Sequence, residues 1–277
     1  MIDPDKIKAL ALDLDGTLLA PEAVLSERTI RAVTGCMRRG LRIIIATGRA
    51  LAATEPFRAA LGAEGPMIYF NGALVTDMPK NETLSTTLLD KKAAEFCLDL
   101  SRELGVYCQF FFPGKDSHIP LITERDGPER EMYYNHTGIQ ARLVDVGEFL
   151  RRDDCGGCFK SMFLAEPEVL ESLRPRLDEQ FGKSVYIART LKTFLEVMDA
   201  KVSKGQALKV VMEHCSLKAE ELIAFGDEEN DLPLLAAAGF SVAPANAQDS
   251  VKAKADLVVG SNAEDGVAVF LEEFFGL

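Results

Sequence analysis

The chain has 277 residues, of which 47% are hydrophobic and 27% charged, and its formal net charge is −12. This length suits one large domain or two moderate ones, and the composition is that of a globular protein. The acidic balance argues against a nucleic-acid-binding protein, which usually carries a basic stripe. The sequence contains neither a signal-peptide pattern nor an apolar run long enough to cross a membrane, so we expect a cytoplasmic protein without membrane partners.

The first part of the chain alternates between short apolar runs and amphipathic segments. Ser26 suits the N-cap of the first amphipathic segment, and Gly40 follows its end. Strands are predicted at 7–14, 41–46 and 67–70, and helices at 26–39 and from about residue 50. This alternation is typical of a parallel sheet with helices on its faces.

The same alternation returns at the end of the chain, with helices predicted at 203–215 and 232–238 and strands at 222–225, 240–243 and 257–259. The middle differs, because aromatic residues cluster there. Its predicted elements are strands at 160–165 and 184–188 and amphipathic helices at 89–104 and 167–181. We therefore predict an α/β fold, with a Rossmann-like parallel-sheet core formed by 1–82 and 196–277 and an α+β cap domain inserted at 83–195.

Four polar clusters follow predicted strands or begin predicted helices. They are Asp13-Leu14-Asp15-Gly16-Thr17, Thr47-Gly48-Arg49, Lys204, and Gly226-Asp227-Glu228-Glu229-Asn230-Asp231. Each by itself is compatible with an ordinary turn or helix cap. In open parallel sheets, however, ligands bind beyond the carboxyl ends of the strands. Four clusters at such positions therefore favour one common site.

Two of these clusters carry acidic and basic side chains in informative positions. Asp13 and Asp15 are two residues apart, so strand alternation predicts that both side chains point to the same face of the strand. A metal ion, a phosphate-bearing ligand with its metal, or solvent would relieve their repulsion. Ser203 suits an N-cap and places Lys204 in the first helical turn, where the helix dipole disfavours a cation. A lysine tolerated there indicates an anionic target, and Lys201 lacks that fixed position.

In this order, the clusters resemble the four motifs of the haloacid dehalogenase (HAD) superfamily, DxDGT, T/S, K and GDxxND. The long insertion between the second and third motifs resembles the cap of the Cof-type (IIB) branch. Three shorter segments also resemble that branch, namely Asn71-Gly72-Ala73, Val242–Ala247 and 265–268. The segment Val242–Ala247 departs in one respect, because relatives usually carry methionine, and often glycine, before the asparagine.

The resemblance implies a phosphatase that works through an aspartyl-phosphate, with Asp13 as the nucleophile and Asp15 as the general acid and base. It implies Mg²⁺ held by Asp13, the backbone carbonyl of Asp15 and Asp227. The remaining site residues that it implies are Thr47, Gly48, Lys204 and Asn230 for the phosphate, with Asp231 and Arg49 in support. Arg49 either contacts the substrate or pairs with a carboxylate.

We expect the substrates to be small phosphorylated metabolites, such as sugar phosphates, because a large cap over the sheet excludes macromolecules. Two alternatives stay open, a phosphomutase of the same fold and a non-catalytic binding or regulatory protein. The latter typically lacks a catalytic carboxylate, and none is missing here. The candidate specificity residues in the cap are His118, Tyr133, Tyr134, His136 and Arg142.

A CxxC pair, Cys155 and Cys158, also lies in the predicted cap. A zinc site would need a second pair of ligands at close spacing, and the sequence offers none. We therefore predict ordinary structural cysteines at these positions.

Overall fold

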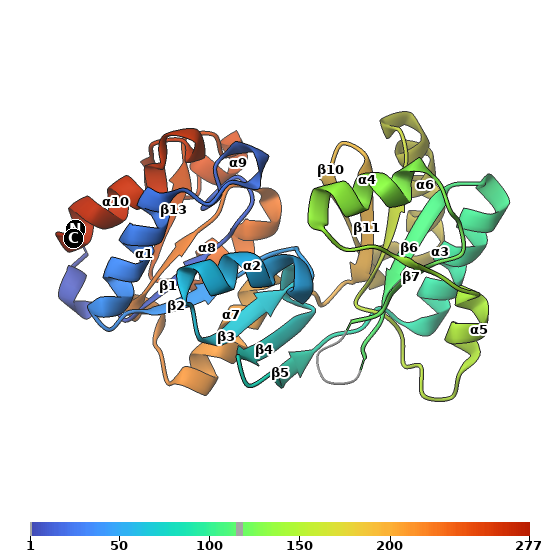
Figure 1. The fold of residues 1–277 in the computed structure, drawn as a ribbon, viewed down its shortest axis with the longest axis horizontal. Coiled ribbons are helices and arrows are strands. Elements are labelled where there is room, and N and C mark those ends of the chain that lie inside the picture. Colours follow the sequence, from blue (N-terminus) through green and yellow to red (C-terminus); the bar gives the residue numbers. More distant parts are fainter. Residues whose placement is uncertain (1, 115–118) are drawn as a thin grey trace. The chain divides into compact units, whose positions relative to one another are not determined.

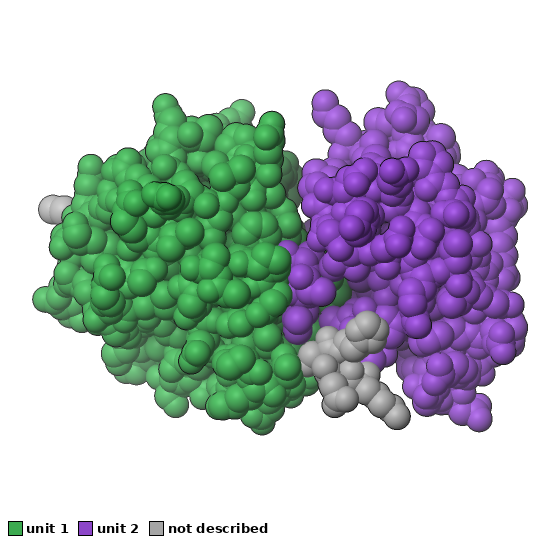
Figure 2. Space-filling model, viewed as in Figure 1, with its two compact units in different colours: residues 1–50, 54–86, 203–277 green, residues 51–53, 87–202 purple. Residues whose placement is uncertain are grey.

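The computed structural model describes residues 2–114 and 119–277, and the chain divides into two compact units (Figure 2). Unit 1 comprises Met1–Ala50, Thr54–Thr86 and Ser203–Leu277, and unit 2 comprises Leu51–Ala53 and Thr87–Val202. The limits predicted from the sequence, after residues 82 and 195, fall inside β5 (Glu82–Thr86) and β11 (Phe194–Asp199). Each of these strands stays with the sheet to which it is hydrogen-bonded, and this shifts both limits.

Unit 1 is built on a five-stranded parallel sheet in the order β14-β13-β12-β1-β2 (Figure 1). Its strands are β1 (Ala9–Leu12), β2 (Arg42–Ile45), β12 (Leu222–Phe225), β13 (Phe240–Pro244) and β14 (Leu257–Val259). The strand β1 pairs with β2 on one side and with β12 on the other, so the two ends of the sequence share one sheet. Both β1 and β12 are buried along their whole length, as expected for a parallel sheet covered on both faces. The predicted α/β core is confirmed.

Helices cover this sheet, with α1 packed beside α10 and α7 packed beside α8. The helices of this part are α1 (Glu27–Arg38), α2 (Leu51–Leu61), α7 (Lys204–Cys215), α8 (Leu232–Ala237), α9 (Asp249–Lys252) and α10 (Gly266–Phe275). The predicted N-cap of α1 is confirmed, because the Ser26 hydroxyl accepts a hydrogen bond from the Thr29 N–H. Ser203 caps α7 in the same way, accepting from the Gln206 N–H.

The strand β3 (Gly65–Tyr69) differs from the prediction, which placed it in the parallel sheet. It pairs antiparallel with β4 (Leu74–Met78), and β4 pairs with β5, so that a separate three-stranded sheet forms. A single parallel bridge, between Ala46 and Ile68, joins β3 to the end of β2. The cause is the turn at 70–72, where φ is +50°, +58° and +103° at successive residues and the chain reverses into a hairpin.

Unit 2 contains a six-stranded sheet in the order β10-β11-β9-β6-β7-β8, antiparallel except between β7 and β8. Its remaining strands are β6 (Tyr107–Phe111), β7 (Leu121–Thr123), β8 (Arg142–Leu143), β9 (Lys160–Leu164) and β10 (Val185–Leu191). Its helices are α3 (Lys91–Leu104), α4 (Pro128–Thr137), α5 (Val146–Arg151) and α6 (Pro167–Phe181). A hydrophobic core that includes Leu98, Phe110, Phe163 and Leu173 joins one face of the sheet to α3 and α6. The unit therefore has the α+β character expected of the inserted segment.

The cysteines of the CxxC pair lie between α5 and β9 in unit 2, and Cys158 forms an isolated antiparallel bridge with Leu89. All six cysteines of the protein are free thiols, and burial raises the pKa of the Cys158 thiol, so this group stays protonated. Gly157, between the two, has φ +130° and packs against the Leu89 carbonyl, where a Cβ would collide.

None of the helices in the described ranges is sufficiently long and apolar to cross a membrane.

Candidate active site

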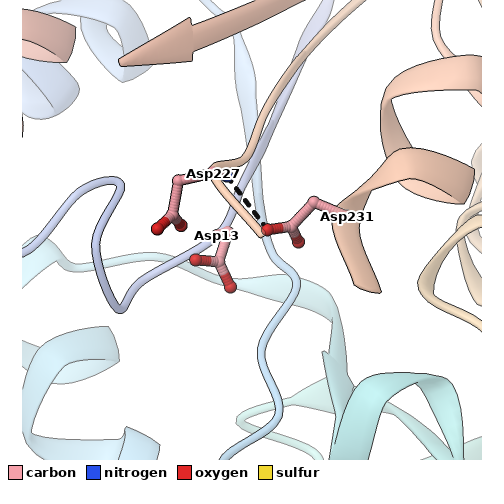
Figure 3. A group of neighbouring side chains, drawn as sticks. All are labelled: Asp13, Asp227 and Asp231. Carbon is pink, nitrogen blue, oxygen red and sulfur yellow. Dashed lines mark hydrogen bonds between the residues drawn. The ribbon is translucent and has the colours of Figure 1, made fainter. Parts of the chain in front are cut away.

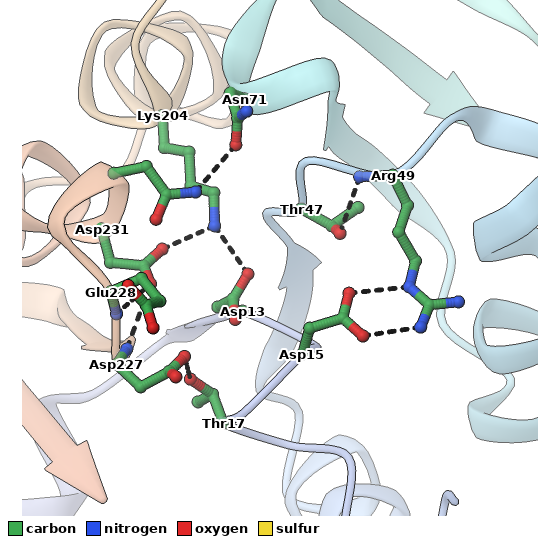
Figure 4. Close-up of polar contacts among 11 residues, drawn as sticks. Asp13, Asp15, Thr17, Thr47, Arg49, Asn71, Lys204, Asp227, Glu228 and Asp231 are labelled. Atoms are coloured by element: carbon green, nitrogen blue, oxygen red, sulfur yellow. Dashed lines mark hydrogen bonds and ion pairs between the residues drawn. The ribbon is translucent and has the colours of Figure 1, made fainter. Parts of the chain in front are cut away.

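The predicted clusters meet at the carboxyl end of the parallel sheet in unit 1 (Figure 4). Three of them directly follow β1, β2 and β12, which are neighbours in the sheet. The fourth, Lys204, is the first residue of α7. The sheet order therefore brings together side chains that are separated by as many as 210 residues of sequence.

Lys204 is the cation at the centre of this site. Its Nζ lies 2.6 Å from Asp13 Oδ1 and 2.6 Å from Asp231 Oδ1, and only 1% of its side chain is exposed. Burial lowers the pKa of Lys204, but the charges of Asp13 and Asp231 outweigh it and the net shift is upward. The lysine is therefore firmly positive. Lys201, in contrast, is exposed.

Three carboxylates surround this lysine. One oxygen from each of Asp13, Asp227 and Asp231 can be chosen so that all lie within 4.8 Å of one another (Figure 3). Burial, together with repulsion from Asp231, raises the pKa of Asp13 well above its usual range, although Lys204 opposes this. Burial also raises the pKa of Asp227 to about 7. One ammonium group does not balance three buried carboxylates, and hard oxygen donors in negative excess fit a divalent cation such as Mg²⁺.

Asp231 differs from the other two carboxylates because protein donors use both of its oxygens. Oδ1 accepts from Lys204, and Oδ2 accepts from the backbone N–H groups of Asp227 and Glu228, each at 3.1 Å. Asp231 therefore shapes the loop after β12 and fixes where Asp227 lies.

The loop after β1 corrects one prediction from the sequence. The strand ends at Leu12, so strand alternation does not place Asp13 and Asp15. Asp13 is 4% exposed and meets Lys204, whereas the side chain of Asp15 is 51% exposed and meets Arg49 (Figure 4). The two are still close enough for the charge of Asp15 to contribute to the raised pKa of Asp13.

Gly16 and Thr17 connect this loop to Asp227. Gly16 has φ +77°, and a Cβ there would lie 2.1 Å from Asp227 Oδ2, so no larger residue fits without movement. The Thr17 hydroxyl donates to Asp227 Oδ1 at 2.7 Å. This contact holds the third carboxylate against the loop that carries Asp13.

The second cluster, Thr47-Gly48-Arg49, lies on the side of Asp13 that faces away from Asp227 (Figure 4). Thr47 is fully buried, and its hydroxyl oxygen accepts from the Arg49 N–H at 3.1 Å. Gly48 is beside Asn71, since a Cβ at Gly48 would lie 2.9 Å from Asn71 Oδ1. Asn230 donates to that same oxygen at 2.9 Å. The structure thus adds Asn71 to the site, and the resemblance of Asn71-Gly72-Ala73 to the Cof-type branch was its signal in the sequence.

A family model for haloacid dehalogenase-like hydrolases matches residues 10–271. The chain belongs to this family. A protein from Haemophilus influenzae is 32% identical to it, over 98% of this chain and 97% of its own. The pyridoxal phosphate phosphatase of Escherichia coli is 30% identical, over 95% of this chain and 97% of its own. The HAD resemblance predicted from the motifs, and with it a hydrolase, is confirmed.

Solved structures resemble this HAD-family chain in fold. A sugar phosphatase of HAD subclass IIB has the same fold, with a TM-score of 0.78, 24% identity, and coverage of 96% of this chain and 98% of the other. This similarity is one of fold, and it agrees with the predicted α/β core that carries a large insertion.

Two asparagines of this HAD core were not predicted as site residues. Asn246 donates to the Gly16 carbonyl at 2.7 Å, and its own Oδ1 accepts from the Asn262 N–H at 2.9 Å. Asn262 also donates to the Leu19 carbonyl at 2.8 Å. Both asparagines therefore hold the backbone of the loop after β1. Asn246 lies within Val242–Ala247, a segment in which the sequence already resembles the family.

The predicted specificity residues lie in unit 2, except that His118 falls outside the described residues. Tyr133 is buried and packs against Phe111 and Phe194, with ring centres 6.1 and 6.0 Å away. His136 and Tyr134 are exposed on α4, and Arg142 is exposed on β8. The packing of Tyr133 is that of a core residue, whereas the other three offer polar groups at the surface of this unit.

Proposed function

We propose that this protein is a Mg²⁺-dependent phosphatase that hydrolyses small phosphorylated metabolites through a phosphorylated Asp13. The observation that carries the proposal is the pairing of buried Asp13 with Lys204, next to two further carboxylates. The pyridoxal phosphate phosphatase among the relatives supports a small phosphorylated substrate. In this proposal unit 1 carries the chemistry and unit 2 selects the substrate.

Asp13, Asp227 and the backbone carbonyl of Asp15 would hold the metal ion. Lys204 contacts only one Asp13 oxygen and Thr17 only one Asp227 oxygen, so each carboxylate would still have oxygen lone pairs to offer a cation. When bound, Mg²⁺ supplies positive charge that offsets the buried carboxylates and the phosphate oxygens. Asp231 supports this set, because it positions the loop that carries Asp227.

Phosphoryl transfer takes two displacements at phosphorus. In the first, an Asp13 oxygen forms a bond to phosphorus, the bond to the ester oxygen breaks, and the Asp15 carboxyl gives its proton to that oxygen. In the second, a water oxygen attacks phosphorus and Asp15 takes the water proton. The bond between Asp13 and phosphorus then breaks, which releases phosphate and restores both carboxyl groups to their initial states.

The phosphoryl group would bind between the second, third and fourth clusters. Thr47 offers its hydroxyl, Gly48 its N–H, and Asn230 its amide. Lys204 has three N–H donors, of which two point to Asp13 and Asp231, and we assign the third to a phosphoryl oxygen. These donors would stabilise the charge that spreads over the equatorial oxygens in the transition state.

The test is phosphate release from a panel of phosphorylated metabolites, with Mg²⁺ and with EDTA. We expect release with Mg²⁺, loss of activity in EDTA, and recovery when Mg²⁺ is restored. Asp13→Asn should lower activity at least about 10⁴-fold, because the nucleophile is gone. Full activity in EDTA would contradict the metal site. A phosphoryl group that passes to a sugar phosphate in preference to water would indicate a mutase, and the absence of turnover on every ester would indicate a binding protein.

A further inference from the structure

Arg49 and Asp15 form a two-point ion pair at the edge of the site. Arg49 Nε donates to Asp15 Oδ2 at 2.7 Å, and Nη2 donates to Oδ1 at 2.6 Å (Figure 4). Two parallel hydrogen bonds from a planar guanidinium fix the plane of the carboxylate as well as its position. The orientation of Asp15 in this structure is therefore set by Arg49.

Arg49 is itself held in place. Its backbone N–H donates to Thr47 Oγ1, and its carbonyl accepts from the Phe70 N–H, each at 3.1 Å. Its guanidinium lies 5.0 Å from the centre of the Phe57 ring, and only 10% of its side chain is exposed. Contacts to the backbone and to the guanidinium of Arg49, other than those with Asp15, therefore fix where the arginine lies.

This pair is poorly explained by stability alone. Half of the Asp15 side chain is exposed, and ion pairs that face solvent contribute little to folding. Arg28 forms a similar pair with Glu272, to which it donates hydrogen bonds from both Nε and Nη2. Nothing in the proposed mechanism involves these two residues. The pair that involves Arg49 differs because its carboxylate follows the proposed nucleophile by two residues.

We propose that Arg49 is a positioning residue that holds the Asp15 carboxyl in the plane needed for proton transfer. This inference rests on the proposed phosphatase function. For proton transfer one of the two hydrogen bonds opens, and the freed Asp15 oxygen takes up a proton from solvent while the other oxygen stays on Arg49. The freed oxygen gives its proton to the ester oxygen in the first step and takes a proton from water in the second. Arg49 neither gains nor loses a proton in either step.

The test uses Arg49→Met, which keeps an unbranched side chain over Phe57 but removes the guanidinium. With p-nitrophenyl phosphate the leaving group needs little protonation, so the first step should survive. The second step should slow about 10- to 100-fold, because an unheld base is misplaced. We therefore expect a burst of nitrophenolate followed by slow turnover. Arg49→Lys should recover part of the loss, and the matched control Arg28→Met should show wild-type kinetics.

A double-mutant cycle then decides whether Arg49 acts through Asp15. If it does, Asp15→Asn combined with Arg49→Met should turn over within about twofold of Asp15→Asn alone. Effects that multiply would overturn the proposal. A raised KM for negatively charged esters without a burst would also overturn it, since Arg49 would then bind the substrate directly.

The same data separate this inference from the function on which it rests. A burst with Asp15→Asn but not with Arg49→Met would leave the phosphatase mechanism intact and refute the role of Arg49. Wild-type turnover by Asp15→Asn on every ester, including those with poor leaving groups, would refute both. Thermal unfolding of each variant shows whether a loss reflects misfolding.

Discussion

Each unit of the protein buries a lysine, but the two lysines meet different charges. In unit 2, Lys160 pairs with Glu196, each only 2% exposed, and the Phe111 ring centre lies 5.0 Å from the ammonium. In unit 1, Lys204 meets two carboxylates, and a third lies beside them. Burial of ionisable groups therefore does not by itself indicate a catalytic site. An excess of one sign favours such a site, because either protons or a further ion of the opposite sign must balance it.

The largest effect that we expect on stability comes from the buried pair of Lys160 and Glu196 in unit 2. Glu196→Gln removes the carboxylate that pairs with the buried Lys160, which should cost about 3–5 kcal/mol of unfolding free energy. Replacing both partners by apolar residues, with Lys160→Met and Glu196→Leu, should recover most of that loss. Urea unfolding of the three proteins checks this. An equal loss in the single and double variants would show that packing at these positions, rather than charge, stabilises the unit.

Lys204 should matter for catalysis as well as for folding, because it pairs with two buried carboxylates. Lys204→Ala removes one preorganised donor to the phosphoryl group, which should cost about 2–4 kcal/mol of transition-state stabilisation. The effect is measured as the loss in kcat/KM at saturating Mg²⁺. Lys201→Ala is the control, because Lys201 is exposed nearby, and it should be nearly silent. If Lys201→Ala caused the larger loss, the assignment of the third motif would be wrong.

The sequence predicted most of the site because each cluster directly follows a clear apolar run or begins a clear helix. The Ser203 N-cap and the helix dipole together predicted an anionic target for Lys204, and this lysine contacts two carboxylates. The hairpin of β4 and β5 was missed because its pattern, with polar residues such as Thr76 and Asp77 inside β4, does not stand out as a strand. Both of these polar residues are buried, which depends on pairing and packing that composition does not reveal.

The remaining gaps concern contacts between distant residues. Asn246 donates to a carbonyl 230 positions earlier in the chain, so no local pattern predicts that contact. The partner of Arg49 stayed open between a substrate and a carboxylate, and only the fold shows that Asp15 meets it. Asp231 and Asp227 share one motif, yet which of them positions the other follows from the hydrogen bonds at the two Asp231 oxygens.

The last prediction concerns the excess charge in unit 1. A cation that binds only the folded protein stabilises it by about 2.7 kcal/mol at a hundredfold excess over Kd. Mg²⁺ should therefore raise the unfolding temperature of the wild type, with no substrate present. Asp227→Asn should lose most of this shift, because it removes one proposed ligand. Without metal, this variant should unfold at or above the temperature of the wild type, since it has one fewer carboxylate in the crowded cluster.

Asp249→Asn is the matched control for this measurement, because the Asp249 side chain is fully exposed. Among the ion pairs of the described residues, Asp249 takes part in one, with a lysine one helical turn away. It should show the same Mg²⁺ shift as the wild type. Equal shifts in all three proteins would mean that Mg²⁺ stabilises the chain through its overall negative charge rather than at Asp227. The expected result is that only Asp227→Asn loses the Mg²⁺-induced rise in unfolding temperature, while its stability without metal is unimpaired. This result would show that the excess charge in unit 1 forms a cation site.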